Sequence, residues 1–335
     1  MHGGGQRRDG GPDMVQTRRL GRSDLEITPI GLGCWQFAQG QGMGGIYWEP
    51  VPQDAIDQIV AASLAGGITW FDTAKVYGNG ASERALARAL RAAGKANGEV
   101  VVATKWWPIL RWAGSIKSTI GERLSCLDGF GIDLYQVHQP FGLSSVAAEM
   151  NAMADLAAEG KIRTVGVSNF NAARMRAAHA ALAARGLPLV SNQMRYSLLD
   201  RRIERNGVLA AAKELGVTVI AYSPLGQGVL TGKFHDDPRL IKTRRGPRKL
   251  MAGFRAKGLE KSWPLIEELK KIASAHGATA SQVALAWLVT VHGDTVVAIP
   301  GASRVGHVQD NVGAMHLTLS ERETRRLDEL SQRFR

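Results

Sequence analysis

Four side chains that can hold or transfer a proton lie at the ends of predicted strands. Asp72, Lys105 and His138 each end a short β-branched run, and Tyr77 follows Asp72 in the next loop. A buried carboxylate would hold the Lys105 ammonium, which would lower the pKa of a nearby phenol from its reference of about 10. The sequence therefore predicts Tyr77 as a general acid. A ring N–H of His138 would orient the oxygen that receives the proton.

No nucleophile accompanies these residues, so the electron pair must come from elsewhere, and a nicotinamide hydride donor meets that requirement. A Schiff-base aldolase built on Lys105 is a weaker alternative, because the adjacent carboxylate keeps the amine charged and a nucleophilic amine must be neutral. The chain contains no H-E-x-x-H, G-x-S-x-G or C-x-x-C motif. We therefore predict no metal site and no serine-hydrolase chemistry.

Eight β-branched runs alternate with alanine- and leucine-rich helical patterns. Repeated βα units predict a parallel sheet, and eight of them favour an α/β fold of the (β/α)₈ TIM-barrel type over an open doubly wound sheet. The carboxyl ends of the strands would then form the functional face. The predicted strands are 30–33, 68–73, 100–104, 134–138, 164–167, 189–193, 218–222 and 296–299, and the predicted helices are 53–64, 82–93, 115–126, 146–158, 172–184, 205–215, 281–291 and 304–313.

Three additions to the barrel are expected. Residues 17–29 predict an N-terminal β-hairpin that plugs the amino-terminal end of the barrel, and the long connection after the seventh strand predicts an extra helix near 259–276. A C-terminal helix is opened by Ser320 and Glu323 in capping-box spacing. We expect residues 1–15, which are rich in glycine and arginine, to be a tail and residues 16–335 to form one barrel domain.

The composition describes a globular chain, with 44% hydrophobic and 21% charged residues. No apolar run approaches the roughly 18 to 20 residues of a spanning helix, and the start of the chain has no secretory h-region. Two cysteines, Cys34 and Cys126, predict no disulfide framework and fit a reducing compartment. These features predict a cytoplasmic protein that acts on a small molecule and does not bind membranes.

The formal net charge is +12, and much of the excess lies in residues 239–257, where no acidic residue occurs. We call these residues the basic stretch. Because the charge is concentrated in one loop, the sequence predicts no nucleic-acid partner. The basic stretch is either a solvated loop or a lid over an anionic cofactor.

Seven segments in order along the chain resemble the aldo-keto reductases. They are FDTAKVYGNGASE (71–83), ATKWW (103–107), LYQVHQP (134–140), GKIRTVGVSNF (160–170), SNQMRYSLL (191–199), AYSPLGQGVLTGK (221–233) and AIPGASRVGHVQDN (298–311). The resemblance implies a catalytic tetrad of Asp72, Tyr77, Lys105 and His138. It also implies a nicotinamide cofactor that lies extended across the barrel mouth without a Rossmann domain.

The resemblance further implies which residues hold the nicotinamide half of the cofactor. Ser168, Asn169 and Gln193 would bind the carboxamide, and Tyr222 would stack on the ring, as suits a flat aromatic group. Backbone near Ser223 and Leu225, in a glycine-rich stretch, would approach the pyrophosphate.

The adenosine half of the cofactor would lie against Gly301, Ser303, Arg304 and Asn311. Ser303 and Arg304 would bind a 2′-phosphate, because a helix N-terminus and an arginine together form a phosphate site. This favours NADPH over NADH. The pattern departs from the family at His307, where many members carry Gln or Arg, and at Asp310, where Glu is usual.

Aromatic residues gather in the loops that follow the strands, including Trp107 and Trp112. We assign a substrate pocket to Trp35, Trp48, Trp106 and Phe141, although burial in the core is the commoner fate of tryptophan. Such a pocket would accept aldehydes and ketones with apolar bodies. The sequence thus predicts an NADPH-dependent reductase of aldehydes or ketones; the alternative is a redox-sensing, nucleotide-binding accessory subunit resembling the β subunits of potassium channels.

Overall fold

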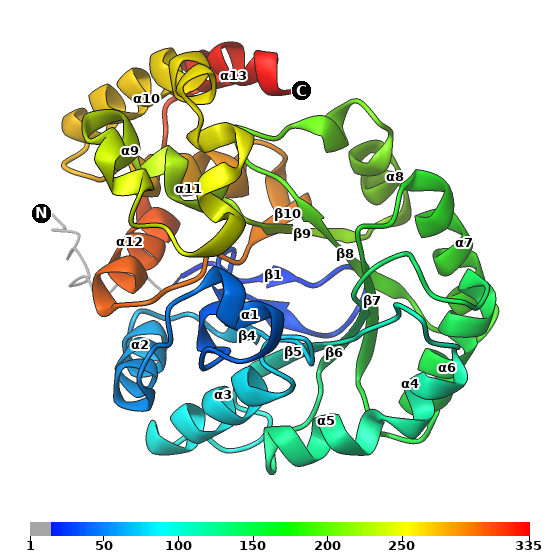
Figure 1. The fold of residues 1–335 in the computed structure, drawn as a ribbon. Coiled ribbons are helices and arrows are strands. Elements are labelled where there is room, and N and C mark those ends of the chain that lie inside the picture. The colour runs from blue at the N-terminus through cyan, green and yellow to red at the C-terminus, as the bar shows by residue number, and fades with distance from the viewer. Residues whose placement is uncertain (1–14) are drawn as a thin grey trace, which may run out of the picture.

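A computed structural model describes residues 15–335, without the side chains of residues 43 and 44, and shows a closed barrel (Figure 1). Isolated parallel bridges from Ile30 to Ala298 and from Gly33 to Gly301 join the first and last strands. The predicted (β/α)₈ barrel is confirmed. Its strands, in spatial order, are β3 (Leu32–Gly33), β4 (Trp70–Asp72), β5 (Val101–Trp106), β6 (Leu134–Val137), β7 (Thr164–Ser168), β8 (Leu189–Arg195), β9 (Thr218–Tyr222) and β10 (Val296–Ala298).

Helices surround the strands and pack an apolar face on them (Figure 1). In α2, for example, Ile56, Ile59, Val60 and Ser63 are buried, which is the spacing of one helical face. The helices of this outer layer are α2 (Gln53–Ala65), α3 (Ala81–Ala92), α4 (Gly114–Ser118), α5 (Ile120–Leu127), α6 (Val146–Ala158), α7 (Ala172–Ala183), α8 (Val208–Leu215), α11 (Ala280–Thr290) and α12 (Val305–His316). None of the helices described is both long and apolar enough to cross a membrane.

Two helices differ from the predicted boundaries. The helix expected over 115–126 divides into α4 and α5 at Thr119, whose hydroxyl donates to the Ser115 carbonyl at 2.6 Å. The helix expected from 205 begins at Val208, because Gly207 adopts a φ of +84° that a helix cannot continue through.

The N-terminal hairpin closes the amino-terminal end of the barrel, as predicted. Strands β1 (Arg18–Arg19) and β2 (Glu26–Ile27) pair antiparallel. Leu20, Leu25 and Ile27 pack with inward-facing residues of the barrel strands, including Trp70 and Leu134. This apolar cluster removes water from the floor on which the functional side chains rest.

The basic stretch is folded against the loop that follows β3. That loop contains a short helix, α1 (Gly42–Tyr47), which the sequence did not predict. Arg248 is buried, with its guanidinium 3.7 Å from the centroid of the Trp48 ring, and Arg245 pairs with Glu49 at 2.7 Å. Figure 1 shows the two segments side by side over one end of the barrel. The predicted extra helix, α10 (Ala256–Ala275), begins in the last two residues of the basic stretch.

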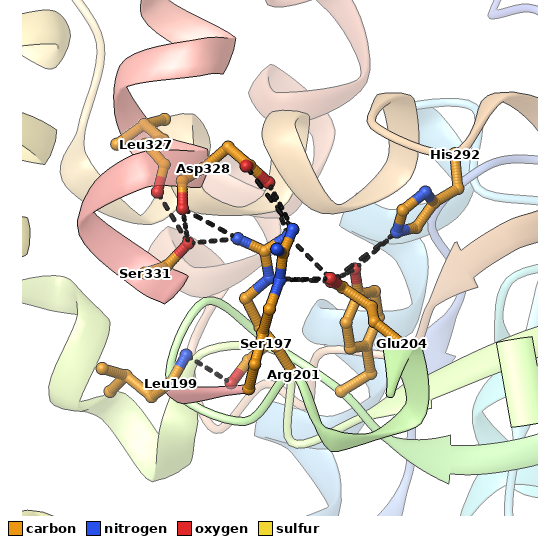
Figure 2. Close-up of polar contacts among 10 residues, drawn as sticks. Ser197, Leu199, Arg201, Glu204, His292, Leu327, Asp328 and Ser331 are labelled. Carbon is orange, nitrogen blue, oxygen red and sulfur yellow. Dashed lines mark hydrogen bonds and ion pairs between the residues drawn. The ribbon is translucent and has the colours of Figure 1, made fainter. Parts of the chain in front are cut away.

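The C-terminal helix α13 (Glu321–Ser331) begins with the predicted capping box and is held by a buried arginine. Arg201 is 0% exposed and donates to Glu204, to Asp328 and to the Ser331 hydroxyl (Figure 2). Its guanidinium also lies 4.9 Å from the centroid of the Trp287 ring. One side chain from the loop after β8 therefore anchors the end of the chain to the barrel.

We expect Arg201→Ala to lower the free energy of unfolding by about 3 to 5 kcal/mol, because the substitution breaks a buried ion pair and leaves Glu204 and Asp328 with Arg335 as their remaining arginine partner. Arg202→Ala is the matched control. The Arg202 side chain is 69% exposed in its pair with Asp200, so its loss should cost about 0 to 1 kcal/mol. Urea denaturation of the two variants beside the parent measures both values. Equal losses would show that the buried arginine does not anchor α13.

Candidate functional site

Polar side chains occupy the inward positions at the carboxyl ends of the strands. Trp70, Ala103 and Leu134 belong to the apolar cluster at the barrel floor. Because successive residues of a strand point to opposite faces, the next inward residue lies two positions further along each strand. Those residues are Asp72, Lys105 and Gln136.

A buried ion pair forms the centre of this layer. Lys105 Nζ donates to Asp72 Oδ1 at 2.5 Å and to the Thr73 carbonyl at 2.8 Å. The other carboxylate oxygen accepts from Gln193 Nε2 at 2.9 Å and Gln136 Nε2 at 3.1 Å. The two charged side chains are almost completely buried. Sequence reasoning missed Gln136, which its inward position two residues before His138 would have revealed.

Tyr77 and His138 lie beside the ion pair. The Lys105 ammonium is 5.2 Å from the centroid of the Tyr77 ring, and the Tyr77 and His138 rings meet edge to face with centroids 5.8 Å apart. Burial, and then the charge of Lys105, hold the pKa of His138 well below its usual range. The imidazole is therefore neutral. Its Nδ1 is buried and has no hydrogen-bond partner among the described residues.

The pKa of Tyr77 differs from the sequence prediction. Burial raises it well above its ordinary value, and the charge of Asp72 raises it further. The expectation of a lowered pKa is wrong for this structure, because burial disfavours the charged phenolate and the neighbouring Asp72 carboxylate disfavours it further. The phenol therefore keeps its proton across the neutral range, which is the state that a proton donor needs.

The residues expected to hold a carboxamide form a connected network. Tyr222 OH donates to Asn169 Oδ1 at 3.1 Å, and Asn169 Nδ2 donates to Ser168 Oγ at 3.1 Å. Asn169 and Ser223 both have positive φ, at +61° and +50°. Backbone strain of this kind in residues other than glycine concentrates at functional sites. Gln193, by contrast, points its amide nitrogen at Asp72.

Of the residues expected at the adenosine end, Gly301, Ser303 and Arg304 precede α12, and Asn311 lies inside it, about two turns after Arg304. Arg304 occupies the N-cap of α12, and no side chain caps the helix. Asn311 is 1% exposed, and its Nδ2 has no partner among the described residues. Gly301 lies against Gln36, whose side chain occupies the place of a Cβ at that position. Leu225 packs at the edge of the core below the glycine-rich turn.

A cluster of cations faces this end of the site. The pKa of Lys233 is lowered by burial and by the charges of Arg244, Arg304 and Arg248. The Nε atoms of Arg244 and Arg248 are buried and have no partner within the described part of the chain. Sequence reasoning gave no role to Lys233, although it ends one of the segments that carry the family resemblance. Positive charge concentrated in this way suits an anionic ligand.

Aromatic side chains form one wall beside Tyr77. Trp35 stacks on Tyr77 with ring centroids 5.8 Å apart, and Trp48 meets Trp35 edge to face at 5.8 Å. Phe141 lies at the rim, where it is 64% exposed. Trp35 and Trp48 therefore lie beside Tyr77, and the assignment of the three residues to a substrate pocket stays a prediction.

Trp106 lies elsewhere. It is 1% exposed, it belongs to the core between strands and helices, and its Nε1 donates to Ser115 Oγ at 3.0 Å. Trp106 points away from the mouth because it follows the inward-facing Lys105 on the same strand. The next residue, Trp107, meets His138 edge to face with centroids 5.3 Å apart and takes the position expected of Trp106.

The fold and this arrangement define an oxidoreductase of the aldo-keto reductase type. The model of the aldo/keto reductase family matches residues 29–332, and the chain belongs to this family. An uncharacterized oxidoreductase of Mycobacterium tuberculosis is 40% identical over 311 residues, which cover 92% of this chain and 91% of that protein. The family generally uses nicotinamide cofactors.

Two further relatives carry more specific names. Chloroplastic pyridoxal reductase of Arabidopsis thaliana is 33% identical over 317 residues, covering 91% of this chain and 83% of that protein. The structure of a glycerol dehydrogenase from Gluconobacter oxydans superposes with a TM-score of 0.81 at 29% identity, covering 95% of each chain.

One buried carboxyl group lies under the loop that carries Phe141. Glu149 of α6 is 2% exposed and lies against Gly142, where a Cβ would approach Oε1 to 2.1 Å. Burial raises the pKa of Glu149 to about 7, although the charge of Arg174 opposes the shift. In the unfolded chain the group titrates near 4.3.

The folded state therefore favours the protonated carboxyl group, and the free energy of unfolding should fall as the pH rises from about 4 to about 7. We expect Glu149→Gln to remove most of this decline, making the variant more stable than the parent at pH 8 by up to about 3 kcal/mol and similar to it at pH 4. Urea denaturation at both pH values measures the difference. Glu260 is exposed, so the control Glu260→Gln should show no such pH-dependent difference from the parent. If the free energies of unfolding of the parent and Glu149→Gln differed by the same amount at pH 4 and pH 8, Glu149 would not be the cause of the decline.

Proposed function

We propose that this chain is an NADPH-dependent reductase that converts aldehydes or ketones into alcohols. The observation that carries the proposal is the buried Asp72–Lys105 ion pair, with Tyr77 and His138 beside it at the barrel mouth. The nicotinamide supplies the hydride when it is bound. The side chains supply the proton and the orientation of the carbonyl group.

Tyr77 donates the proton to the carbonyl oxygen in this proposal. Its raised pKa keeps the phenol protonated until the oxygen becomes basic enough to accept. His138 is neutral, so it orients the oxygen through a ring N–H without competing for the proton. Asp72 and Lys105 act as positioning residues, because their hydrogen bonds fix the polar floor below the phenol.

The described residues fit a dinucleotide phosphate. Asn311 presents a buried and unpartnered amide nitrogen, and α12 has an N-terminus without a side-chain cap, next to Arg304. Lys233 and Arg244 add positive charge at the same end. NADH has no 2′-phosphate, so its binding would leave some of these cations without an anionic partner. The 2′-phosphate of NADPH would supply that partner, which supports NADPH.

The substrate class follows from the wall of the mouth. Trp35, Trp48 and Trp107 surround the Tyr77–His138 corner with aromatic surface, and Phe141 extends it at the rim. Such a wall favours carbonyl compounds with an apolar or aromatic body. The names of the two relatives, pyridoxal reductase and glycerol dehydrogenase, span an aromatic and a polyol substrate.

Tyr77→Phe should reduce kcat with NADPH and an aromatic aldehyde by a factor of about 10² or more, because general acid assistance is lost. The Kd for NADPH should change little. Loss of nicotinamide absorbance measures the first, and quenching of tryptophan fluorescence measures the second. Turnover that survives the substitution contradicts the role of Tyr77. Tight cofactor binding by the parent without turnover of any carbonyl compound favours the accessory-subunit alternative.

Arg304→Ala should raise the Kd for NADP⁺ at least tenfold and leave the Kd for NAD⁺ within about twofold, since a charge-assisted contact to a phosphate contributes on the order of 1.5 to 3 kcal/mol. The exposed Arg325→Ala on α13 is the control for net charge. An equal rise in the Kd values of both cofactors would show that Arg304 does not bind the 2′-phosphate.

A further inference from the structure

Two hydrogen-bond donors face the ring of His307 in the first turn of α12. Arg304 Nε is 3.1 Å from His307 Nε2, and the backbone nitrogen of Ser303 is 3.3 Å from His307 Nδ1. The Ser303 hydroxyl is also 3.5 Å from Nδ1. His307 stands at the position where the sequence departs from the family pattern.

A neutral imidazole cannot satisfy both donors, because it has one N–H and one lone pair. The guanidinium of Arg304 is always protonated, so Nε2 must carry the lone pair that faces it. The ring proton then lies on Nδ1, where it can be donated to the Ser303 hydroxyl. The backbone N–H of Ser303 finds no lone pair on the ring in this tautomer and is free for another acceptor.

The charges that act on the ring are positive and come from three segments of the chain. Arg304 precedes α12, Lys233 comes from α9 (Lys233–Asp236), and Arg244 comes from the basic stretch. With burial, these three charges lower the pKa of His307 to about 4. The carboxyl group one turn further along α12, Asp310, accepts a hydrogen bond from Thr279 Oγ1 at the N-cap of α11.

We propose that His307 gains a proton when the 2′-phosphate of the cofactor binds, and that the protonated ring favours NADP⁺ over NAD⁺. In the free protein the ring is neutral, and it takes up a proton from solvent when a phosphate dianion binds at Ser303 and Arg304. The anion supplies acceptors for the Ser303 N–H and the Arg304 guanidinium, which releases the Nε2 lone pair. A protonated ring then offers two N–H donors to the phosphate.

The consequence is that cofactor preference depends on pH. This inference rests on the proposed function, because it requires a 2′-phosphate at this site. Where binding takes up a proton, the association constant rises as the pH falls, by at most tenfold per pH unit. The second pKa of a phosphate is about 6, so the phosphate is almost wholly dianionic at pH 8 and about half dianionic at pH 6, equally in the parent and in any His307 variant. NAD⁺ has no 2′-phosphate and should show no such rise.

The test measures the Kd values of NADP⁺ and NAD⁺ by quenching of tryptophan fluorescence at pH 6, 7 and 8. In the parent, the ratio of Kd for NAD⁺ to Kd for NADP⁺ should increase at least threefold from pH 8 to pH 6. His307→Gln should abolish this increase, because an amide does not titrate in the range. The control His316→Gln, at the exposed end of α12, should retain it. The same increase in His307→Gln would overturn the inference.

Proton uptake gives an independent measurement. Calorimetry of NADP⁺ binding near pH 6.5, in two buffers with different ionisation enthalpies, counts the protons taken up. The parent should take up more protons than His307→Gln, and both proteins should give the same count with NAD⁺. Equal counts with NADP⁺ would overturn the proposal, and an unchanged Kd for NAD⁺ confirms that the variant is folded.

The outcomes separate this inference from the proposed function. Absence of any NADP⁺ preference in the parent at all three pH values would contradict the 2′-phosphate site itself, and the His307 inference with it. A preference that depends on Arg304 but is independent of pH would leave the proposed function intact and overturn only the role of His307.

Discussion

The buried ion pair between Asp72 and Lys105 is stable only if the rest of the structure excludes water from it and satisfies its remaining hydrogen-bonding groups. Removing two charges from water costs several kcal/mol per ion, and their attraction compensates only where the remaining hydrogen-bonding groups are satisfied. Here the carboxylate accepts from Gln136 of β6 and Gln193 of β8, and the ammonium donates to the Thr73 carbonyl. The pair and its two glutamine partners come from four strands, β4, β5, β6 and β8, so the pair requires a closed barrel and a dry floor, which the N-terminal hairpin provides.

The mouth has two electrostatically different ends. Around Asp72 the charges balance, and burial keeps the titratable groups in their uncharged forms, with Tyr77 protonated and His138 neutral. At the start of α12 the charges do not balance, and the cations lower one another's pKa values, as at Lys233. The first end suits an uncharged carbonyl group, and the second suits a polyanion. One extended ligand that is apolar-aromatic at one end and phosphorylated at the other matches both.

Two segments outside the barrel strands are attached to the barrel through contacts between distant parts of the chain. The basic stretch is joined to the loop after β3 by Arg245 with Glu49 and by Arg248 over Trp48. The C-terminal helix is joined to the loop after β8 by Arg201 (Figure 2). In both places an arginine, with its planar guanidinium, combines an ion pair or hydrogen bond with stacking on an aromatic ring.

The sequence by itself determined the order of strands and helices, because these depend on local hydrophobic periodicity and turn residues. It also placed Asp72, Lys105 and His138 at strand ends. Only the tertiary structure decided that Trp106 is buried and Trp107 faces the mouth, since the predicted strand ended at 104 and alternation was not applied beyond it. The pKa of Tyr77 and the acceptor state of His307 likewise depend on burial and on charges brought together from separate elements. Desolvation and long-range charge are properties of the packed molecule, and no local pattern encodes them.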